Sequence, residues 1–378
     1  MAVSSSGTAP IGVIGCRRVL PPEFPIGLSE NSGNLIHANA PIAMFPTAVD
    51  QPPRGSGLAF HDWVNQNCSH LIFCFANLVR FDLPDPQRYI NARKTIERYR
   101  VPLVVFGLGA QAVSEEIEQL TLPAEGIDFL KALADRTPVI GVRGQFSADS
   151  IKHIAGIDNV AVTGCPSFFS RPAAFDMLDH NLNELSGWRP AYAATALKDP
   201  AEARLIAKAI KQDAHWIEPV QASTTAYAVS IQRGQSAPLP WQLVPLFDSG
   251  ELTKEQFRDY FERRFHLFRT VEAWYEFNES QVGWTTGTRF HVNMASLLSG
   301  LPTLWITHDS RTRELTDFLK VPRLPLAEAA DMSFDELRES IDFTECFQAL
   351  PELFATWNRY LAIHNLPPVP LPEICATA

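Results

Sequence analysis

The sequence predicts an α/β protein of two domains, each built on a parallel β-sheet. Apolar runs of strand length, such as LIFCF at 71–75 and LVVFGL at 103–108, alternate with segments of helical periodicity. Strands that are apolar throughout are typical of a parallel sheet covered by helices on both faces. The alternation lapses between residues 171 and 188 and then resumes, and 378 residues are long for one compact core.

The elements of each half follow from this pattern. In the first half we expect, in chain order, a strand near 11–15, a helix over 33–44, a strand over 69–80, a helix over 87–100, a strand over 101–111, a helix over 126–137, a strand, turn and helix over 138–154, and a strand over 160–169. In the second half we expect a strand over 191–197, a helix over 200–213, a strand over 214–223, a long helix over 253–277 with phenylalanines at helical spacing, strand–helix–strand–helix over 284–319, and two helices within 333–364.

These elements give the predicted domain organisation. An N-terminal α/β domain covers residues 1–170, a linker 171–188, a C-terminal α/β domain 189–345, and a helical tail 346–378. A cleft is expected where the two domains meet, because parallel sheets bind ligands outside the carboxyl ends of their strands.

Composition excludes several classes of function. The formal net charge of −10 and the pI of about 5.5 argue against nucleic-acid binding, which requires a basic face. No apolar run approaches the ~18 residues of a membrane span, and the N-terminus lacks the basic region of a signal peptide. The six cysteines do not have zinc-site spacing, so we expect reduced thiols in a cytoplasmic protein. Nucleotide-loop and metal motifs are also missing from the sequence, so we expect no metal and no cofactor.

Polar side chains at the predicted strand ends are the candidate site residues. They are Asn77, Gly109, Gln111, Arg143, Thr288, Arg289, His291, His308, Asp309 and Arg311. Gly109 allows close backbone approach at a strand end. Arg143 ends a buried strand, where an arginine requires an acidic partner or a ligand. Gln111 lines the cleft or caps a turn. Asp309 or Ser310 is a candidate helix N-cap, and the roles of Asp309 and Arg311 in the cleft are left open.

The strongest candidate is the helix start near Arg289 and His291. Thr288 is expected to cap this helix, so that free backbone N–H groups, the helix dipole and a guanidinium would converge on one point. That combination is typical of an anion site for phosphate or carboxylate. The alternative is that Arg289 pairs with a local carboxylate while His291 only packs.

Four segments occur in an informative order: VVFGLGAQ, VIGVRGQFSADSI, VAVTGCPSFF and GTRFHVNMASLLSGLPTLWI. Together they resemble the polysaccharide pyruvyl transferase family, over roughly residues 30–320. The most specific part is the R-x-H-x-x-x-x-A-x-x-x-G-x-P run, here Arg289, His291, Gly300 and Pro302. The resemblance implies a fold of the GT-B type, with two Rossmann-like domains facing across a cleft.

The resemblance also implies a reaction. The donor would be phosphoenolpyruvate, used as a co-substrate, and the acceptor a sugar with two suitably placed hydroxyls in an exopolysaccharide, another polymer or its precursor. The products would be a pyruvate ketal and inorganic phosphate. Arg143, Arg289 and Gly109 would bind the donor, either arginine taking its phosphate or its carboxylate, and His291 would be the general acid or base. A lipid-linked acceptor, and a peripheral position at the inner face of the membrane, are compatible with this expectation.

Two alternatives remain at this point. A GT-B glycosyltransferase would use a nucleotide sugar and would require an acidic residue for the ribose in the second domain, which the sequence does not reveal. A non-catalytic relative would bind a sugar or an anion without turnover. The oligomeric state is not predicted, and the segment 188–260, where the resemblance is weakest, is expected to help select the acceptor.

Overall fold

The computed structural model describes residues 9–15, 17–21, 31–75, 77–112, 115–184, 188–194, 199–219 and 223–376. The chain divides into two compact units that are each built from several chain segments. The first unit comprises Met1–Cys16, His37–Ser170 and Glu352–Pro370, and the second comprises Arg17–Ile36, Arg171–Pro351 and Leu371–Ala378.

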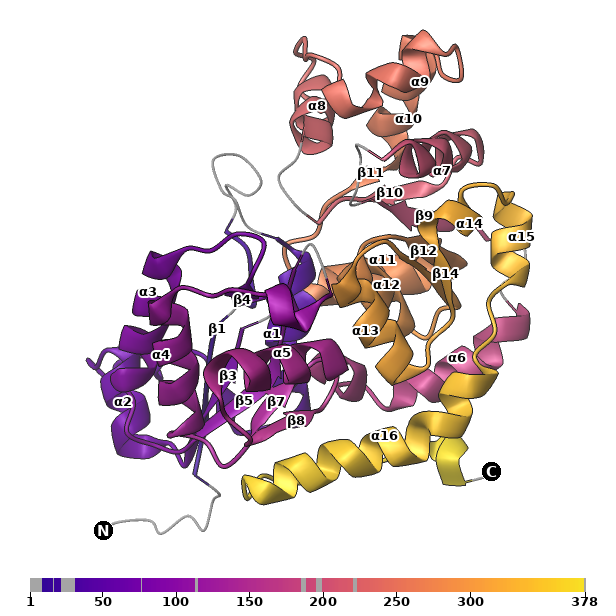
Figure 1. The fold of residues 1–378 in the computed structure, drawn as a ribbon. Coiled ribbons are helices and arrows are strands. Elements are labelled where there is room, and N and C mark those ends of the chain that lie inside the picture. The colour runs from indigo at the N-terminus through magenta and orange to yellow at the C-terminus, as the bar shows by residue number, and fades with distance from the viewer. Residues whose placement is uncertain are drawn as a thin grey trace. The chain divides into compact units, whose positions relative to one another are not determined.

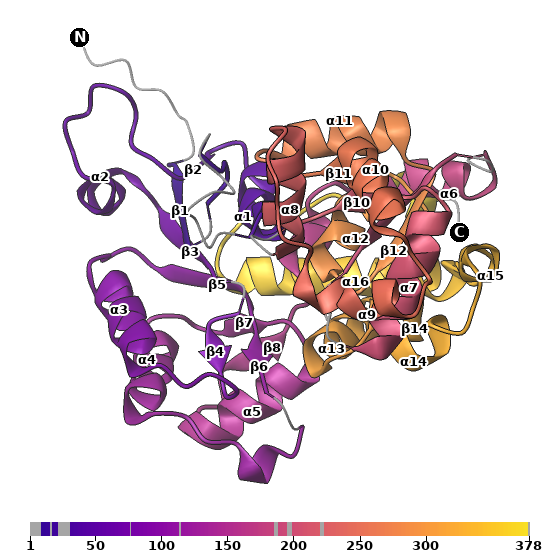
Figure 2. The same cartoon turned by 90° about the horizontal axis from the view of Figure 1, so that it is seen from above.

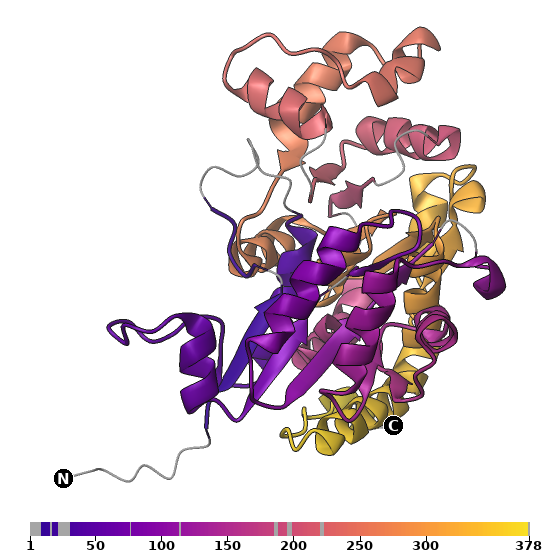
Figure 3. The same cartoon turned by 60° about the vertical axis from the view of Figure 1, so that its left-hand side comes forward.

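The first unit contains a six-stranded parallel sheet in the order β2-β1-β3-β5-β7-β8. Its strands are β1 (Ile11–Gly15), β2 (Ala48–Val49), β3 (His70–Cys74), β5 (Leu103–Leu108), β7 (Ile140–Val142) and β8 (Val160–Val162). Counted along the chain, this order is that of flavodoxin-like doubly wound folds. Figure 3 shows these strands, coloured indigo to magenta, side by side behind helices of the same unit. A separate parallel pair joins β4 (Val79–Arg80) to β6 (Ala110–Gln111).

Helices cover both faces of this first sheet. Side chains of one face form a core with α2 (Phe60–Asn67), α3 (Pro86–Glu97), α4 (Ala124–Ala134) and α5 (Gln145–Ala155), and α3 lies beside α4 (Figure 2). The other face packs on the end of α1 (Gly33–Met44) and the later part of α16 (Thr344–Ile363). There the Phe106 and Trp357 rings lie 4.9 Å apart, and the Tyr360 hydroxyl donates to the Val105 carbonyl at 2.6 Å.

The second unit contains another six-stranded parallel sheet, in the order β11-β10-β9-β12-β13-β14 (Figure 1). Its strands are β9 (Pro190–Ala193), β10 (His215–Ile217), β11 (Phe265–His266), β12 (Trp284–Gly287), β13 (Thr303–Thr307) and β14 (Arg323–Pro325). Counted along the chain, this is the 3-2-1-4-5-6 order of Rossmann folds. The order reverses between β9 and β12, which is where such sheets bind ligands at the carboxyl edge.

Helices again lie on both faces of the second sheet. One core joins the sheet to α7 (Pro200–Lys211), α8 (Ser223–Gln232), α9 (Val244–Asp248), α10 (Lys254–Arg264), α14 (Leu326–Ala329) and α15 (Phe334–Glu339). Elsewhere α12 (Phe290–Leu297) contacts β12, β13, α6 (Ala173–Glu184) and α11 (Val271–Gln281), and α13 (Ser310–Leu319) follows β13. Among the described residues, none of the helices has both the length and the hydrophobicity of a membrane span.

The predicted α/β class with two Rossmann-like parallel sheets is confirmed, and several details differ. The long helix predicted over 253–277 is wrong. Phe265 and His266 form β11 beside β10, and α11 starts afresh after Thr270, whose hydroxyl caps it by accepting from the Ala273 N–H at 3.3 Å. The helical spacing of the phenylalanines continues across this break because Phe265, the first residue of β11, is buried in the same core as Phe257 and Phe261 of α10.

The division into units also differs from the predicted boundaries. The main segment of the first unit, His37–Ser170, does end at the predicted domain boundary, residue 170. Residues 17–36, however, group with the second unit, and 352–370 group with the first. The segment predicted as a linker contains α6, a helix of 12 residues. The predicted helical tail, 346–378, is divided between the two units, because aromatic residues in the later part of α16 pack on the first sheet.

A histidine pair in the second unit predicts a pH-dependent stability. His215 Nδ1 lies 2.9 Å from His266 Nε2. Burial lowers the pKa of His215 to about 4 and that of His266 to about 3. Both are therefore neutral in the folded state at pH values where the unfolded chain, with a histidine pKa near 6.5, binds protons. Stability is fully present above about pH 6.5 and is lost as pH falls toward the folded values.

Urea denaturation between pH 7 and pH 5 measures this effect. The free energy of unfolding should fall with decreasing pH, and His266→Asn should reduce the number of protons taken up on unfolding by about one. His153→Asn, at an exposed position on α5, is the control. An unchanged proton uptake in His266→Asn would contradict the prediction.

Candidate active site

The candidate site of the second unit lies at the carboxyl edge of its sheet, where β9, β12 and β13 are neighbours. Ala194 follows β9, Thr288 and Arg289 follow β12, and His308 follows β13. Sheet pairing therefore brings together three segments that are far apart in the sequence. This edge includes the point between β9 and β12 where the strand order reverses.

Arg289 is held in place by main-chain and side-chain oxygens. Its Nε donates to the Ala194 carbonyl at 2.7 Å, and its Nη2 lies 3.8 Å from Glu218 Oε1. Burial lowers the pKa of Arg289 from its ordinary value, the charge of Glu218 opposes this, and the charge of Arg311 adds to it. The side chain is 19% exposed, so a largely desolvated guanidinium lies at the carboxyl edge of the sheet.

Glu218 is a site residue that the sequence did not reveal. It directly follows β10 and is 1% exposed. Its Oε2 accepts from the Thr224 hydroxyl at 3.0 Å and from the Trp216 indole N–H at 3.4 Å, while Oε1 faces Arg289. Arg289 thus has a carboxylate neighbour, as in the alternative in which this arginine pairs with a carboxylate. That carboxylate is not local in the sequence, however, because Glu218 follows β10, and its Oε1 lies 3.8 Å from Arg289 Nη2.

The prediction that Thr288 caps α12 is wrong. The N-cap is Arg289, without a side-chain cap hydrogen bond. The Thr288 hydroxyl instead donates to the buried carboxylate of Glu202 on α7, and its N–H donates to the Ala193 carbonyl at 3.0 Å. Extended pairing with β9 therefore continues one residue past β12 and turns the threonine away from the helix start.

Gly287 allows the close approach of β12 to the Ala193 backbone of β9, and its replacement is expected to destabilise the fold. Its φ is +139°, and a Cβ there would lie 2.2 Å from the Ala193 carbonyl oxygen. Gly287→Ala should lower the free energy of unfolding by about 2–4 kcal/mol, through both backbone strain and the clash. Gly250→Ala is a matched control, since φ is +74° there but nothing lies within 4 Å of the added atom. Equal losses in the two variants, measured by urea denaturation, would contradict the clash.

His291 lies in the first turn of α12 and is half-buried. Its ring stands edge-on to the neighbouring Phe290 ring, with centroids 5.4 Å apart. A Cβ added to Gly33 would come 3.3 Å from His291 Cβ, so the start of α1 packs on this turn within the second unit. Arg289 and His291 are therefore separated by one residue at the helix start, as predicted.

The predicted group of His308, Asp309 and Arg311 does assemble in the structure. Asp309 is the N-cap of α13, as expected, and its Oδ1 accepts from the Thr312 N–H at 2.7 Å. Its Oδ2 lies 3.2 Å from Arg311 Nη2 and 3.6 Å from His308 Nε2. Burial lowers the pKa of His308; Asp309 opposes that shift, and Arg311 and Arg289 add to it. The charges of this group and of Arg289 thus act on one another.

Four predicted residues of the first unit also come together. Arg143 follows β7 and is 2% exposed. Its guanidinium donates to the amide oxygen of Asn77 and, at 3.3 Å, to the Gly107 carbonyl. Asn77 Nδ2 in turn donates to Gln111 Oε1 at 3.3 Å. A Cβ on Gly109 would lie 2.7 Å from the Arg143 side chain, so this glycine makes room for the guanidinium.

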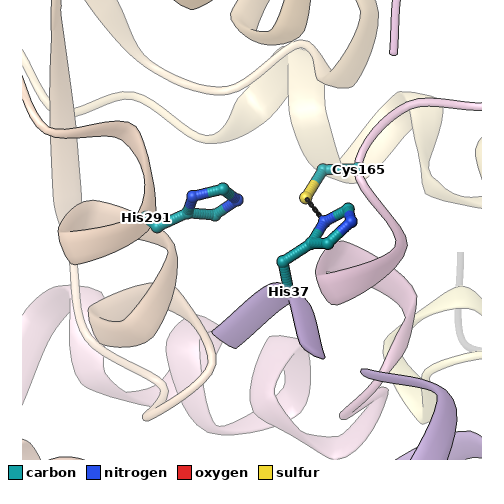
Figure 4. A group of neighbouring side chains, drawn as sticks. All are labelled: His37, Cys165 and His291. Atoms are coloured by element: carbon teal, nitrogen blue, oxygen red, sulfur yellow. Dashed lines mark hydrogen bonds between the residues drawn. The ribbon is translucent and has the colours of Figure 1, made fainter. Parts of the chain in front are cut away.

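His37 and Cys165 are further residues of the first unit that the sequence did not single out. Cys165 Sγ lies 3.7 Å from His37 Nδ1, the contact dashed in Figure 4, which also labels His291 of the second unit. Burial, reinforced by the charge of Arg143, lowers the pKa of His37 to about 3. Burial raises the pKa of the Cys165 thiol. Both groups are therefore uncharged near neutral pH, and the charge of Arg143 acts on both of them.

The second unit therefore places a desolvated arginine, a histidine and a helix start at one edge. A family model described as polysaccharide pyruvyl transferase matches residues 23–310, which include all of these groups. The chain belongs to the polysaccharide pyruvyl transferase family. Membership identifies it as a transferase that acts on a polysaccharide. No curated protein matches the sequence.

Several solved structures resemble the chain at low sequence identity. A putative UDP-N-acetylglucosamine 2-epimerase from Listeria monocytogenes is 11% identical, with a TM-score of 0.43, over 97% of this chain and 99% of that one. The UDP complex of S. aureus MnaA is 9% identical, with a TM-score of 0.43, over 96% and 98%. Anabaena HepE in complex with UDP is 11% identical, with a TM-score of 0.41, over 97% and 98%.

Proposed function

We propose that this family member transfers the enolpyruvyl group of phosphoenolpyruvate to two hydroxyls of a sugar, giving a pyruvate ketal and inorganic phosphate. The observation that carries the proposal is the placement of Arg289 and His291 at the start of α12, at the edge where the strand order of the second sheet reverses. A fixed cation and a titratable group one residue apart suit a donor that carries two acidic groups.

Donor binding rests on the arginines. The 3.8 Å separation from Glu218 leaves the Arg289 guanidinium able to form shorter, charge-assisted hydrogen bonds with an anion. The nearby charge of Arg311, which already acts on Arg289, adds to the attraction. In the first unit, Arg143 is held by neutral oxygens of Asn77 and Gly107 and keeps its positive charge. We assign Arg289 and Arg143 to the donor's phosphate and carboxylate, in either order, with Gly109 giving Arg143 its space.

His291 supplies the proton transfers. In the first step it gives a proton to the methylene carbon of phosphoenolpyruvate, which becomes a methyl group, and the C2 cation is attacked by one sugar hydroxyl. That hydroxyl loses its proton, phosphate leaves with the C–O electron pair, and the second hydroxyl closes the ketal ring. Two hydroxyl protons are lost in all: one balances the new methyl group and the other is carried away with the phosphate. Arginines stabilise the leaving phosphate, so the proposed reaction uses no metal ion.

We also propose a cytoplasmic reaction on an exopolysaccharide or its precursor, including a lipid-linked one at the inner face of the membrane. The five described cysteines form no disulfide with one another, which fits a reducing compartment. The added carboxylate would give the glycan negative charge.

A nucleotide-sugar transferase is the second candidate, and Glu218 is the observation that favours it. In Rossmann domains an acidic residue near the end of the second strand binds the ribose, and Glu218 directly follows β10, the second strand of this domain. However, its carboxylate already accepts from Thr224 and Trp216 and faces Arg289. This arrangement favours a role for Glu218 beside the arginine over ribose binding.

Calorimetry with the whole protein tests the choice between the two donors. We expect phosphoenolpyruvate to bind and uridine diphosphate sugars not to compete with it. Phosphate release from phosphoenolpyruvate in the presence of neutral oligosaccharides then tests turnover. Binding of a nucleotide sugar without binding of phosphoenolpyruvate would overturn the proposal in favour of the second candidate. Binding without phosphate release for any acceptor would indicate the non-catalytic alternative.

A further inference from the structure

One pocket of the second unit lies at the opposite edge of the sheet from Arg289. Its volume is about 730 Å³, and its lining includes Pro190 and Trp284, the first residues of β9 and β12. Arg289 follows the last residue of β12, so the strand's length separates the pocket from the candidate donor site. The amino edge of the sheet has no part in the chemistry proposed above.

The pocket combines an aromatic surface with a polar rim. The Trp188 side chain is 44% exposed, although a large aromatic side chain is usually buried. Buried rings of Trp284 and Phe334, with centroids 5.7 Å apart, also line the pocket. The polar groups around them come from Arg189, Gln212, Asp213, Asp335, Arg338 and Glu339.

The position of Trp188 is fixed by its neighbours. A Cβ added to Gly283 would lie 2.5 Å from Trp188 Cβ, so the tryptophan packs directly on the bare backbone before β12. The Gly283 N–H donates to the Arg189 carbonyl at 2.9 Å. Arg189 Nη1 donates to the Asp213 carbonyl at 2.8 Å and also pairs with that aspartate's carboxylate. The exposed indole is thus presented by an anchored segment.

We propose that this pocket binds a neutral stretch of the acceptor polysaccharide, away from the reacting sugar. The C–H face of a pyranose ring is apolar and packs on an exposed indole, while its hydroxyls exchange hydrogen bonds with carboxylates, amides and guanidinium groups. The lining carries two arginines against three acidic residues, so recognition rests on hydroxyls and aromatic surface, with little net charge to attract an anion. This inference rests on the proposed action on a polysaccharide and adds a second contact for the same polymer.

Oligosaccharide binding in the absence of any donor tests the pocket separately from the reaction. The probes are immobilised short oligosaccharides of glucose, galactose and mannose, presented to the whole protein. Wild type is expected to bind at least one of them, and Trp188→Ala to weaken that binding about tenfold or more. Trp188→Phe, which keeps an aromatic ring, should retain most of the affinity.

Trp241→Ala is the matched control, because Trp241 is also a highly exposed tryptophan of the second unit but does not line this pocket. It should bind oligosaccharides like wild type. Arg289→Ala should also keep oligosaccharide binding while it loses phosphoenolpyruvate binding, so a failure of the donor proposal and a failure of the glycan site give different results. Gln212→Ala, at an exposed position of the rim, provides a second test should Trp188→Ala fail to fold.

Two results would overturn the inference. One is that wild type binds none of the oligosaccharides at millimolar concentration. The other is that Trp188→Ala and Trp241→Ala bind alike, which would place any glycan contact elsewhere on the protein.

Discussion

Arg289→Ala is expected to weaken phosphoenolpyruvate binding by about a hundredfold or more. Hydrogen bonds to charged groups are worth about 1.5–3 kcal/mol each, and 2.7 kcal/mol corresponds to a factor of about 100. The guanidinium of Arg289 is already positioned by the Ala194 carbonyl, so little of its binding energy is used to order the side chain. Calorimetric titration of phosphoenolpyruvate into wild type and the variant measures the loss directly.

The Arg289→Ala experiment needs a control for the effect of the substitution on the buried carboxylate of Glu218. Removing Arg289 takes away a cation that faces the 1% exposed carboxylate of Glu218, and this loss can destabilise the fold regardless of any ligand. The double variant Arg289→Ala/Glu218→Gln removes that charge and should restore thermal stability without restoring donor binding. Arg258→Ala, at an exposed arginine paired with Glu262 on α10, controls for loss of a positive charge. Wild-type affinity in the double variant would refute the donor role of Arg289.

The order of the elements could be predicted from the sequence because both sheets are parallel. Buried parallel strands are apolar throughout, and their helices have the 3.6-residue period, so the two patterns are easily told apart. The helix predicted over 33–44 is observed at those bounds. The sequence failed at β11, where two residues continue an aromatic helical pattern but pair with β10. The sequence could not predict the composition of the two units either. Residues 17–36 belong to the second unit and 352–370 to the first because of tertiary packing, which the local sequence pattern does not show.

The sequence could predict the site residues that lie at strand ends. It could not predict the side-chain partners that are distant in the sequence. Arg143, Asn77, Gln111 and Gly109 converge because β-strand ends share an edge. Glu218 and Glu202 were missed because their partners, Arg289 and Thr288, lie just after β12 and far away in the sequence, and nothing local marks either glutamate as a partner. Thr288 was misassigned for the same reason, since its hydroxyl has a buried carboxylate as its partner and does not cap the following helix.

In each unit, one arginine is held in place by contacts within that unit. The second unit provides a reversal of strand order at β9 and β12 with Arg289 beside it. The first unit provides Arg143 at the end of β7, fixed by neutral oxygens and by the space at Gly109. Each unit therefore positions one arginine by its own contacts before any ligand binds. A preorganised cation of this kind loses little ordering entropy when it binds an anionic group.

His291→Gln is expected to reduce kcat by a factor of about 10²–10⁴ while changing the Kd for phosphoenolpyruvate only a few-fold. General acid–base catalysis contributes a rate factor of this size, and glutamine keeps a polar side chain in the first turn of α12 but cannot transfer a proton. Phosphate release measures kcat, and calorimetry measures the Kd of the same preparations. A parallel loss of both quantities would instead make His291 part of the donor-binding contact.

The pH profile distinguishes this histidine from the others. In wild type, kcat should depend on the protonation state of His291, and this pH dependence should disappear in the residual activity of His291→Gln. His37 is not the source of such a limb, because burial and the charge of Arg143 lower its pKa to about 3. His180→Gln, at an exposed position on α6 of the same unit, is the control and should keep both the rate and the profile of wild type. A profile that survives unchanged in His291→Gln would assign the proton transfers to another group and remove His291 from the catalytic step.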